Sequence, residues 1–270
     1  MTLIIESKGL IAKRKIISFA DYPFDVEDCH VVFFYGCKNK VAIPGFSCKE
    51  FSTLIIDLTL NLEEIWRRMD RKSCRYAIKR AIRDGVKVKL NENYEDFYNI
   101  DRRFRERKGF SPIGPSVDFM KKYGTLFAAE FDGETVAGAF FLENTNTIRW
   151  VSAASKRFEV EKNKAILIGN ANHLIIWEAI KNAKEKGIKE FDMGGYYTGS
   201  NKSDPRYTIN LFKKSFGGKL VKRFDYQKYY SRLVYMYTAL RTPGIVRKLE
   251  QRVRIMTFIL KKLRELKALG

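Results

Sequence analysis

The 270-residue sequence has few of the residues that bind metals or form disulfide networks. It contains two histidines, at positions 30 and 173, and four cysteines, at positions 29, 37, 48 and 74, with no C-x-x-C pair. A structural zinc site needs about four nitrogen or sulfur ligands at close spacing. The pattern therefore excludes a zinc-finger protein, and it predicts no metal and no other cofactor.

Long hydrophobic runs are also missing. No stretch reaches the roughly 20 apolar residues of a membrane-spanning helix. The apolar run from Met1 to Ile5 is too short for a signal peptide. These absences favour a reduced, cytoplasmic protein, and peripheral contact with the inner face of the membrane stays open as an alternative.

Acidic residues are scarce relative to basic ones. The 51 lysines and arginines exceed the 31 aspartates and glutamates by 20, which gives a formal net charge of +20. This excess favours an anionic partner, namely nucleic acid, a phosphorylated or lipid-linked substrate, or an acidic membrane surface, although it also serves solubility. Hydrophobic residues make up 45% of the chain, which excludes an intrinsically disordered protein.

Hydrophobic periodicity and turn residues divide the chain into strands and helices. The capping pair Asn61 and Glu64 predicts a helix over 61–84 that Gly85 ends. The turn Asp132-Gly133 predicts a hairpin. The expected strands are 10–19, 30–35, 40–43, 53–57, 86–90, 125–131, 135–142, 147–154, 188–193 and 219–225, and the other helices are 94–108, 116–123, 165–186 and 207–215. Strands 125–154 form an antiparallel meander, and strands 147–154 and 188–193 flank a helix and are expected to be parallel.

The sequence from Arg241 onward predicts an amphipathic helix. Its apolar stripe repeats three and four residues apart, and the segment has nine basic and two acidic residues, a net charge of 9 − 2 = +7. The stripe consists of Val246, Leu249, Val253, Met256, Leu260 and Leu263. Such a helix packs on the body or on a second copy in one interpretation, and lies on an anionic membrane surface in the other.

The helix predicted over 61–84 has a basic face. Its basic residues recur three and four apart, so they share one side of the helix. They are Arg68, Lys72, Arg75, Lys79 and Arg83, with Arg80 beside them. Phosphate groups along this face would offset the repulsion between the like charges. A solvated helix face explains the pattern equally well.

Two further segments contain candidate functional residues. Phe191-Asp192-Met193-Gly194-Gly195 is a strand that ends in two glycines, which lets a backbone or a ligand approach closely. The segment 211–218 places Lys213 between Phe212 and Phe216. A lysine ammonium in a half-apolar pocket stabilises developing negative charge more strongly than it does in water. Taken singly, a tight turn and an exposed lysine pair explain these segments as well.

Together, three spaced motifs resemble the FemABX family, the aminoacyl-tRNA-dependent peptidyltransferases built from GNAT-like domains. They are R-x-x-I-K-R-A-I-R-D-G-V-x-V at 75–88, F-D-M-G-G-Y at 191–196 and L-F-K-K-S-F-G-G-K-L-V at 211–221. The order of elements from residue 94 is also that of a GNAT-type domain. The resemblance covers 54–226. It implies an α+β (mixed α/β) fold with a GNAT-like transferase domain over 61–230, a β-rich remnant of a first GNAT-like domain over 1–60, and a basic helix over 231–270.

The resemblance also implies a reaction. Members transfer an amino acid from the 3′ ester of a charged tRNA to an amine, in most cases the side-chain amine of a lipid-linked or nucleotide-linked cell-wall precursor peptide. The family's F-K motif places the catalytic lysine at Lys213, where it would stabilise the transition state. The implied substrate-binding residues are Phe212, Lys214, Asp192, Gly194, Gly195, Tyr196, Arg75, Lys79 and Arg80. The implied partners are aminoacyl-tRNA and a phosphate-bearing or lipid-linked amine acceptor.

Two other functions are open. An ordinary GNAT acyltransferase grips the pyrophosphate of acyl-CoA with a glycine-containing loop before its long helix. The corresponding segment here, 156–164, contains no glycine, although its lysines could hold phosphate. The third interpretation is a non-catalytic protein that binds RNA or membranes. His173, Trp150 and Trp177 are interpreted as packed core residues.

Overall fold

The computed structural model of the chain describes residues 2–8, 12–109, 111 and 114–240. The helix predicted from residue 241 onward lies outside these residues. None of the described helices combines the length and the apolar composition that a bilayer-spanning segment requires.

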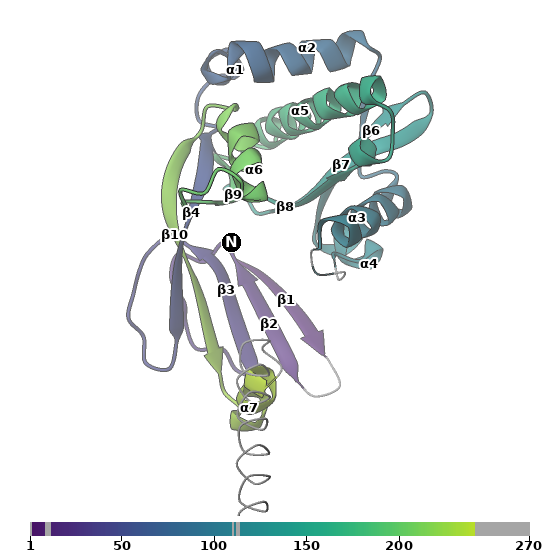
Figure 1. Ribbon diagram of the computed structural model, residues 1–270. Helices are drawn as coiled ribbons and strands as arrows, with labels where there is room; N and C mark the ends of the chain where they lie inside the picture. The colour runs from purple at the N-terminus through teal and green to yellow at the C-terminus, as the bar shows by residue number, and fades with distance from the viewer. Residues whose placement is uncertain (1, 9–11, 110, 112–113, 241–270) are drawn as a thin grey trace, which may run out of the picture.

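The described strands form one sheet in the order β1-β2-β3-β10-β4-β9-β8-β7-β6-β5. Their bounds are β1 Leu3–Lys8, β2 Lys13–Ser18, β3 Val31–Cys37, β4 Ser47–Asp57, β5 Lys87–Leu90, β6 Gly124–Phe131, β7 Glu134–Glu143, β8 Thr147–Ser155, β9 Glu190–Tyr196 and β10 Lys219–Tyr229. The pairs β2–β3 and β8–β9 are parallel, and the other neighbours are antiparallel. The sheet has a lower limb that contains β1, β2 and β3 and an upper limb that contains β5 to β9 (Figure 1). The long strands β4 and β10 run through both limbs (Figure 1).

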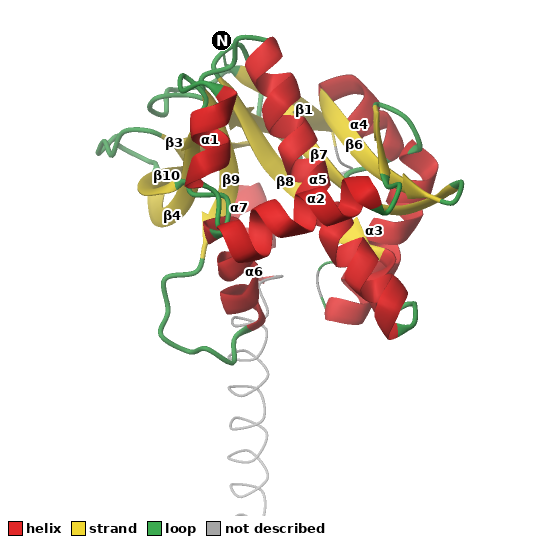
Figure 2. Ribbon diagram, turned by 90° about the horizontal axis from the view of Figure 1, so that it is seen from above, coloured by secondary structure: helices red, strands yellow, loops and turns green. Residues whose placement is uncertain are grey.

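Helices cover both faces of the upper limb. The helices are α1 Leu62–Arg68, α2 Tyr76–Arg83, α3 Tyr94–Lys108, α4 Val117–Tyr123, α5 Lys162–Glu185, α6 Pro205–Lys214 and α7 Arg232–Leu240. Helices α2 and α5 pack together over one face of the sheet, and α3 and α4 cover the opposite face (Figures 1 and 2). The largest buried cluster lies between α5 and the sheet, where Phe141 and Phe191 pack edge to face. Burial of these large apolar side chains is the main source of stability.

Strands from before and after residue 60 belong to the same sheet, because β4 lies between β10 and β9. Residues Thr53 and Ile55 of β4 pair with Gly195 and Asp192 of β9, the strand that contains the glycine pair. The first 57 residues therefore contribute directly to the surroundings of the candidate site.

The helix predicted over 61–84 is interrupted, which corrects the prediction of one continuous basic face. Helix α1 ends at Arg68, and Met69 and Asp70 have extended ψ angles of 144° and 127°. A π-helical turn, Arg71–Arg75, then leads into α2. The Asp70 carboxylate accepts hydrogen bonds from the amide and hydroxyl of Ser73, and the Asp70 amide donates to the Ser215 carbonyl at 2.8 Å. Capping by Asp70 and this long-range bond outweigh the helical periodicity.

Two predictions for the N-terminal part are also wrong. Strand β1 was not predicted, because its short apolar run shows no strand signal beyond a few residues. Residues 40–43 form a loop instead of the expected strand. The Tyr226 hydroxyl takes the place of a strand partner here, since it accepts from the Val41 amide at 2.7 Å and lies 3.1 Å from the Val41 carbonyl.

Candidate active site

The parallel strands β8 and β9 separate halfway along their length. They pair only from Thr147 to Arg149 on β8 and from Glu190 to Asp192 on β9. Beyond these residues β8 stays paired with β7, and β9 with β4. The parallel arrangement is the one predicted from the sequence. The separation leaves room between the two strands, and helix α6 packs against β9 at this place.

The Lys213 side chain points into this opening from α6. Only 6% of the residue is exposed, and its Nζ donates to the Gly195 carbonyl at 2.7 Å. The same nitrogen lies 5.1 Å from the centre of the Trp150 ring on β8. A lysine ammonium has three donors. One is used by Gly195, so donors remain for a substrate oxygen, and the aromatic face adds a favourable cation–π contact.

Burial lowers the pKa of Lys213 to about 8, and the Asp192 carboxylate acts in the opposite direction. At pH 7 the ammonium form still exceeds the amine by about tenfold. The site thus contains a partly desolvated positive charge. Such a charge interacts strongly with a developing oxyanion, because little water screens it.

Asn210 attaches the segment after β9 to α6. Its side-chain amide donates to the Tyr197 carbonyl at 2.6 Å and accepts from the Tyr197 amide at 3.0 Å. Asn210 and Lys213 are three residues apart on α6 and are the two buried residues of that helix. They therefore hold the backbone around Gly195 at two points.

The two glycines at the end of β9 differ in their surroundings. Gly194 has φ +72°, and a Cβ there would lie 3.1 Å from the Trp150 carbonyl oxygen and 3.8 Å from Lys213 Nζ. Gly195 is exposed, and a Cβ at this position would meet no atom within 4 Å. The backbone conformation at position 194 thus requires glycine, whereas Gly195 has open space where a side chain would stand.

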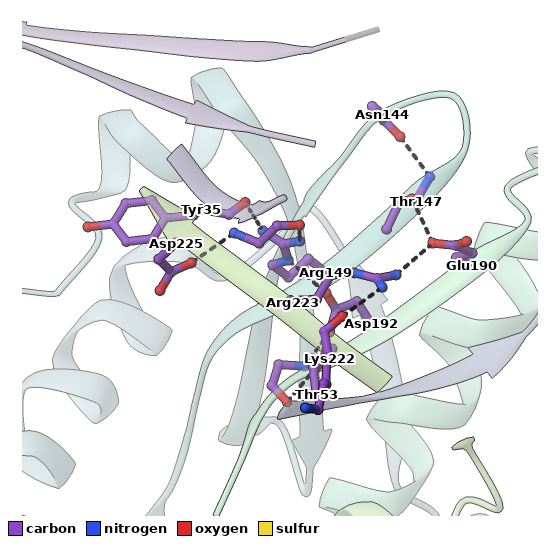
Figure 3. Close-up of polar contacts among 12 residues, drawn as sticks. Tyr35, Thr53, Asn144, Thr147, Arg149, Glu190, Asp192, Lys222, Arg223 and Asp225 are labelled. Carbon is purple, nitrogen blue, oxygen red and sulfur yellow. Dashed lines mark hydrogen bonds and ion pairs between the residues drawn. The ribbon is translucent and has the colours of Figure 1, made fainter. Parts of the chain in front are cut away.

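The buried Asp192 carboxylate holds the backbone at Gly194 in place. It is 1% exposed, and its Oδ1 accepts from the Gly194 amide at 2.8 Å and lies at hydrogen-bond distance from the Thr53 hydroxyl. Its Oδ2 pairs with Nε of Arg149 at 2.8 Å. Arg149 also donates to the Tyr35 carbonyl at 2.8 Å (Figure 3). The network therefore joins β3, β4, β8 and β9 directly behind the Lys213 pocket.

A polar cavity of about 200 Å³ lies on the Arg149 side of this network. Lys38 and Arg223 face Glu190 there, at 3.4 Å and 3.6 Å. Figure 3 shows Arg223 beside Glu190. Basic and acidic side chains are balanced around this cavity. Among the described residues, no three His, Cys, Asp or Glu side chains lie close enough to share a metal ion.

An apolar cavity of about 280 Å³ lies on the Lys213 side, between β8, α5 and α6. Phe212 lines it and packs against Trp150 and Phe216, with ring centres 6.0 Å and 5.3 Å apart. Tyr196 is half-buried and packs on the main core, and Lys214 is exposed. The structure thus brings Lys213, Phe212, Asp192 and the two glycines together, whereas the Lys214 side chain is exposed to solvent.

The predicted basic residues of α2 lie on a different surface. Lys79 and Arg80 are exposed, and Arg80 pairs with Asp84 at 2.7 Å beside an open hollow of about 730 Å³. The residues lining this hollow and those lining the apolar cavity do not overlap. Arg75 is half-buried, and its Nε has no hydrogen-bond partner among the described residues.

Three residues of the site were not predicted from the sequence. Trp150 was interpreted as core, and Arg149 and Thr53 were not singled out. The sequence around Arg149 does indicate a special role, since a lone arginine within a mostly apolar strand needs a buried partner. Nothing in the local sequence distinguishes Thr53 from other strand threonines. His173 packs against Phe212, with ring centres 4.6 Å apart, as the core interpretation predicted.

Comparison with known proteins gives a match in structure alone. No family model and no curated protein matches the sequence. The solved structure of FemX aligns over 87% of this chain and 85% of its own, with a TM-score of 0.61 and 14% identity. The C-terminal domain of a lysylphosphatidylglycerol synthetase from Agrobacterium fabrum aligns over 91% and 87%, with a TM-score of 0.53 and 14% identity.

L-PGS from Bacillus licheniformis aligns over 91% of this chain and 86% of its own, with a TM-score of 0.50 and 15% identity. Identities this low establish the fold and leave the substrates open. The comparisons confirm the predicted fold class, and the chain has the mixed α/β, GNAT-like fold of FemABX type that is also found in FemX.

Proposed function

We propose that this protein is an acyltransferase that moves an aminoacyl group from aminoacyl-tRNA to an amine, such as that of a cell-wall precursor peptide or a related lipid-linked or phosphate-bearing acceptor. The observation on which the proposal depends is the buried Lys213 ammonium, held 2.7 Å from the Gly195 carbonyl where β8 and β9 separate. The solved structures of similar fold support transfer chemistry of this kind.

In this reaction the acceptor nitrogen attacks the ester carbonyl carbon and a C–N bond forms. The carbonyl oxygen becomes negatively charged, and the Lys213 ammonium stabilises it. The intermediate then collapses, the C–O bond to the ribose breaks, and the ribose oxygen takes up the proton that the amine loses. Aminolysis of an ester is downhill, so the reaction needs no ATP. Desolvation of Lys213 strengthens its effect on the oxyanion.

The charge distribution supports tRNA as the donor. The chain has a net charge of +20, and Lys79, Arg80 and Arg83 are exposed on α2. Exposed cations of this kind bind a phosphate backbone without regard to sequence. We place the tRNA backbone on this basic surface and its acceptor end at Lys213.

The segment before α5 favours tRNA over acyl-CoA. A short 3₁₀ turn, Lys156–Phe158, precedes α5, and the N-cap residue of α5 is Glu161. The Glu161 side chain makes no capping hydrogen bond, and its negative charge beside the helix N-terminus would repel the pyrophosphate of CoA.

A transfer assay with purified protein tests the proposal. Radiolabelled aminoacyl-tRNA pools are offered with amine acceptors, and acyl-CoA donors are offered in parallel. Removal of one oxyanion donor lowers kcat by about 100- to 1,000-fold in enzymes of known mechanism. We expect Lys213→Met to lower kcat to this extent with little change in the KM for tRNA.

Lys189→Met is the matched control, since Lys189 is an exposed lysine outside the site, and we expect it to react at the wild-type rate. Transfer from acyl-CoA alone would replace the proposal with the GNAT alternative. Equal rates for Lys213→Met and wild type would remove Lys213 from the mechanism. Salt-dependent RNA binding without any transfer would indicate a non-catalytic protein.

A further inference from the structure

The apolar cavity beside Lys213 is a candidate side-chain pocket. It measures about 280 Å³ and lies between β8, α5 and α6. Its walls include Ala153, Ile175, Ile176, Ile209 and Phe212, and its polar groups come from serine, threonine, asparagine and arginine side chains. No aspartate or glutamate is among the described residues that line it.

Trp150 contacts both the cavity and the proposed catalytic residue, Lys213. Its ring lines the cavity, and the ring centre is 5.1 Å from Lys213 Nζ. An ester carbonyl held at the ammonium would have its α-carbon one bond away. Lys213 itself does not line the cavity, so the side chain on that α-carbon would reach the cavity by passing along the Trp150 ring. The cavity is thus placed to receive a substituent of the acyl group itself.

The size and charge of the cavity restrict that substituent. An engineered apolar cavity of about 150 Å³ binds benzene, so about 280 Å³ holds an aromatic or branched aliphatic side chain with space to spare. Glycine or alanine would leave most of it empty and would gain little from burial. A lysine side chain would find Arg157 on the lining and no carboxylate with which to pair.

We infer that the aminoacyl group transferred by this protein has a large apolar side chain, such as leucine, isoleucine, methionine or phenylalanine, which occupies the cavity between Trp150, Ile209 and Phe212. This inference rests on the proposed function and specifies its donor. The terminal adenine of the tRNA is the competing occupant. It is less well placed, because the ribose separates the base from the ester carbonyl that Lys213 contacts.

The test compares donors and one charge-introducing variant. Leucyl-, phenylalanyl-, glycyl- and lysyl-tRNA are assayed separately, and we expect kcat/KM for the two apolar donors to exceed that for glycyl-tRNA by at least about 100-fold. Ile209 is 40% exposed, so Ile209→Asp adds a carboxylate to the cavity rim without burying it fully. We expect the kcat/KM of this variant to fall at least about tenfold with leucyl-tRNA and to rise with lysyl-tRNA. Leu211→Asp is the control, since Leu211 is on the same helix, 54% exposed and outside the lining.

Binding measurements keep the inference testable if no transfer occurs. The probes are amide-linked leucyl and glycyl derivatives of 3′-amino-3′-deoxyadenosine, and the unacylated nucleoside. Tighter binding of the leucyl probe that Ile209→Asp weakens and Leu211→Asp preserves would support the pocket, even if failed transfer refuted the proposed function. Transfer that is equally fast from glycyl-tRNA and insensitive to Ile209→Asp would overturn the inference and leave the proposed function standing. Equal binding of the leucyl probe and the unacylated nucleoside, both weakened by Ile209→Asp, would assign the cavity to adenine and overturn it as well.

Discussion

Replacement of Lys213 should make the protein more stable while it removes activity. Burial lowers the pKa of Lys213 from 10.5 to about 8, a difference that corresponds to about 3 kcal/mol. The folded state binds fewer protons at this position than the unfolded state between about pH 8 and 10.5. The free energy of unfolding therefore rises with pH across that window. At pH 7 the ammonium lowers the stability of the fold by nearly the whole amount.

Lys213→Met removes the ammonium and keeps much of the apolar stem. The Gly195 carbonyl loses its donor, but Gly195 is exposed, so water can replace the bond. We expect the variant to gain up to about 3 kcal/mol in free energy of unfolding at pH 7. The gain should shrink by about that amount as the pH approaches 10.5.

Urea unfolding followed by tryptophan fluorescence, from pH 7 to 10.5, measures both proteins under the same conditions. Burial raises the pKa values of the Cys37 and Cys74 thiols to about 12, so both proteins lose stability near the top of this range. These contributions cancel in the difference between variant and wild type. Lys214→Met is the matched control, and we expect it to bring no comparable gain in free energy of unfolding at pH 7, because Lys214 is exposed. If the free energies of unfolding of Lys213→Met and wild type differ by the same amount at pH 7 and pH 10.5, the argument is refuted, because the ammonium is then not desolvated in the fold.

Three further predictions concern the backbone and the buried charges around the site. Gly194→Ala should lose about 1–3 kcal/mol of stability in urea unfolding, because Gly194 has φ +72°, whereas Gly195→Ala should stay within about 0.5 kcal/mol of wild type. Arg149→Met should cost about 3–5 kcal/mol, because it leaves the buried Asp192 carboxylate without its cation. Asp192→Asn should recover part of that loss in the double mutant, and additive losses would argue against the ion pair. Burial lowers the pKa of His173, so stability should fall from pH 7 to pH 5, and less so in His173→Phe, as thermal unfolding can measure.

The sequence by itself determined most of the elements between residues 61 and 230. Helix α3 begins and ends at the predicted residues, and strands β6, β7 and β8 agree within one residue at each end. These elements depend on signals a few residues apart. The Asp132-Gly133 turn is an example, since both residues adopt the positive φ angles, 51° and 74°, that their side chains permit. The glycine stops Gly85 and Gly187 act in the same local way.

Tertiary structure alone decided which of the predicted site residues meet. Lys213 and Lys214 are identical neighbours, yet Lys213 is buried at Gly195 and Lys214 is exposed. Which lysine turns inward depends on how α6 packs against β9. The interruption after α1 depends likewise on the bond from Asp70 to Ser215, 145 residues further along the chain.

The separation of β8 and β9, which places Trp150 at the ammonium, has a similar origin. Each strand keeps its outer neighbour beyond Arg149 and Asp192, so the two part where their mutual pairing ends. Burial and strand pairing depend on residues far apart in the chain. Local sequence patterns therefore predict the elements but do not determine which side chains face one another.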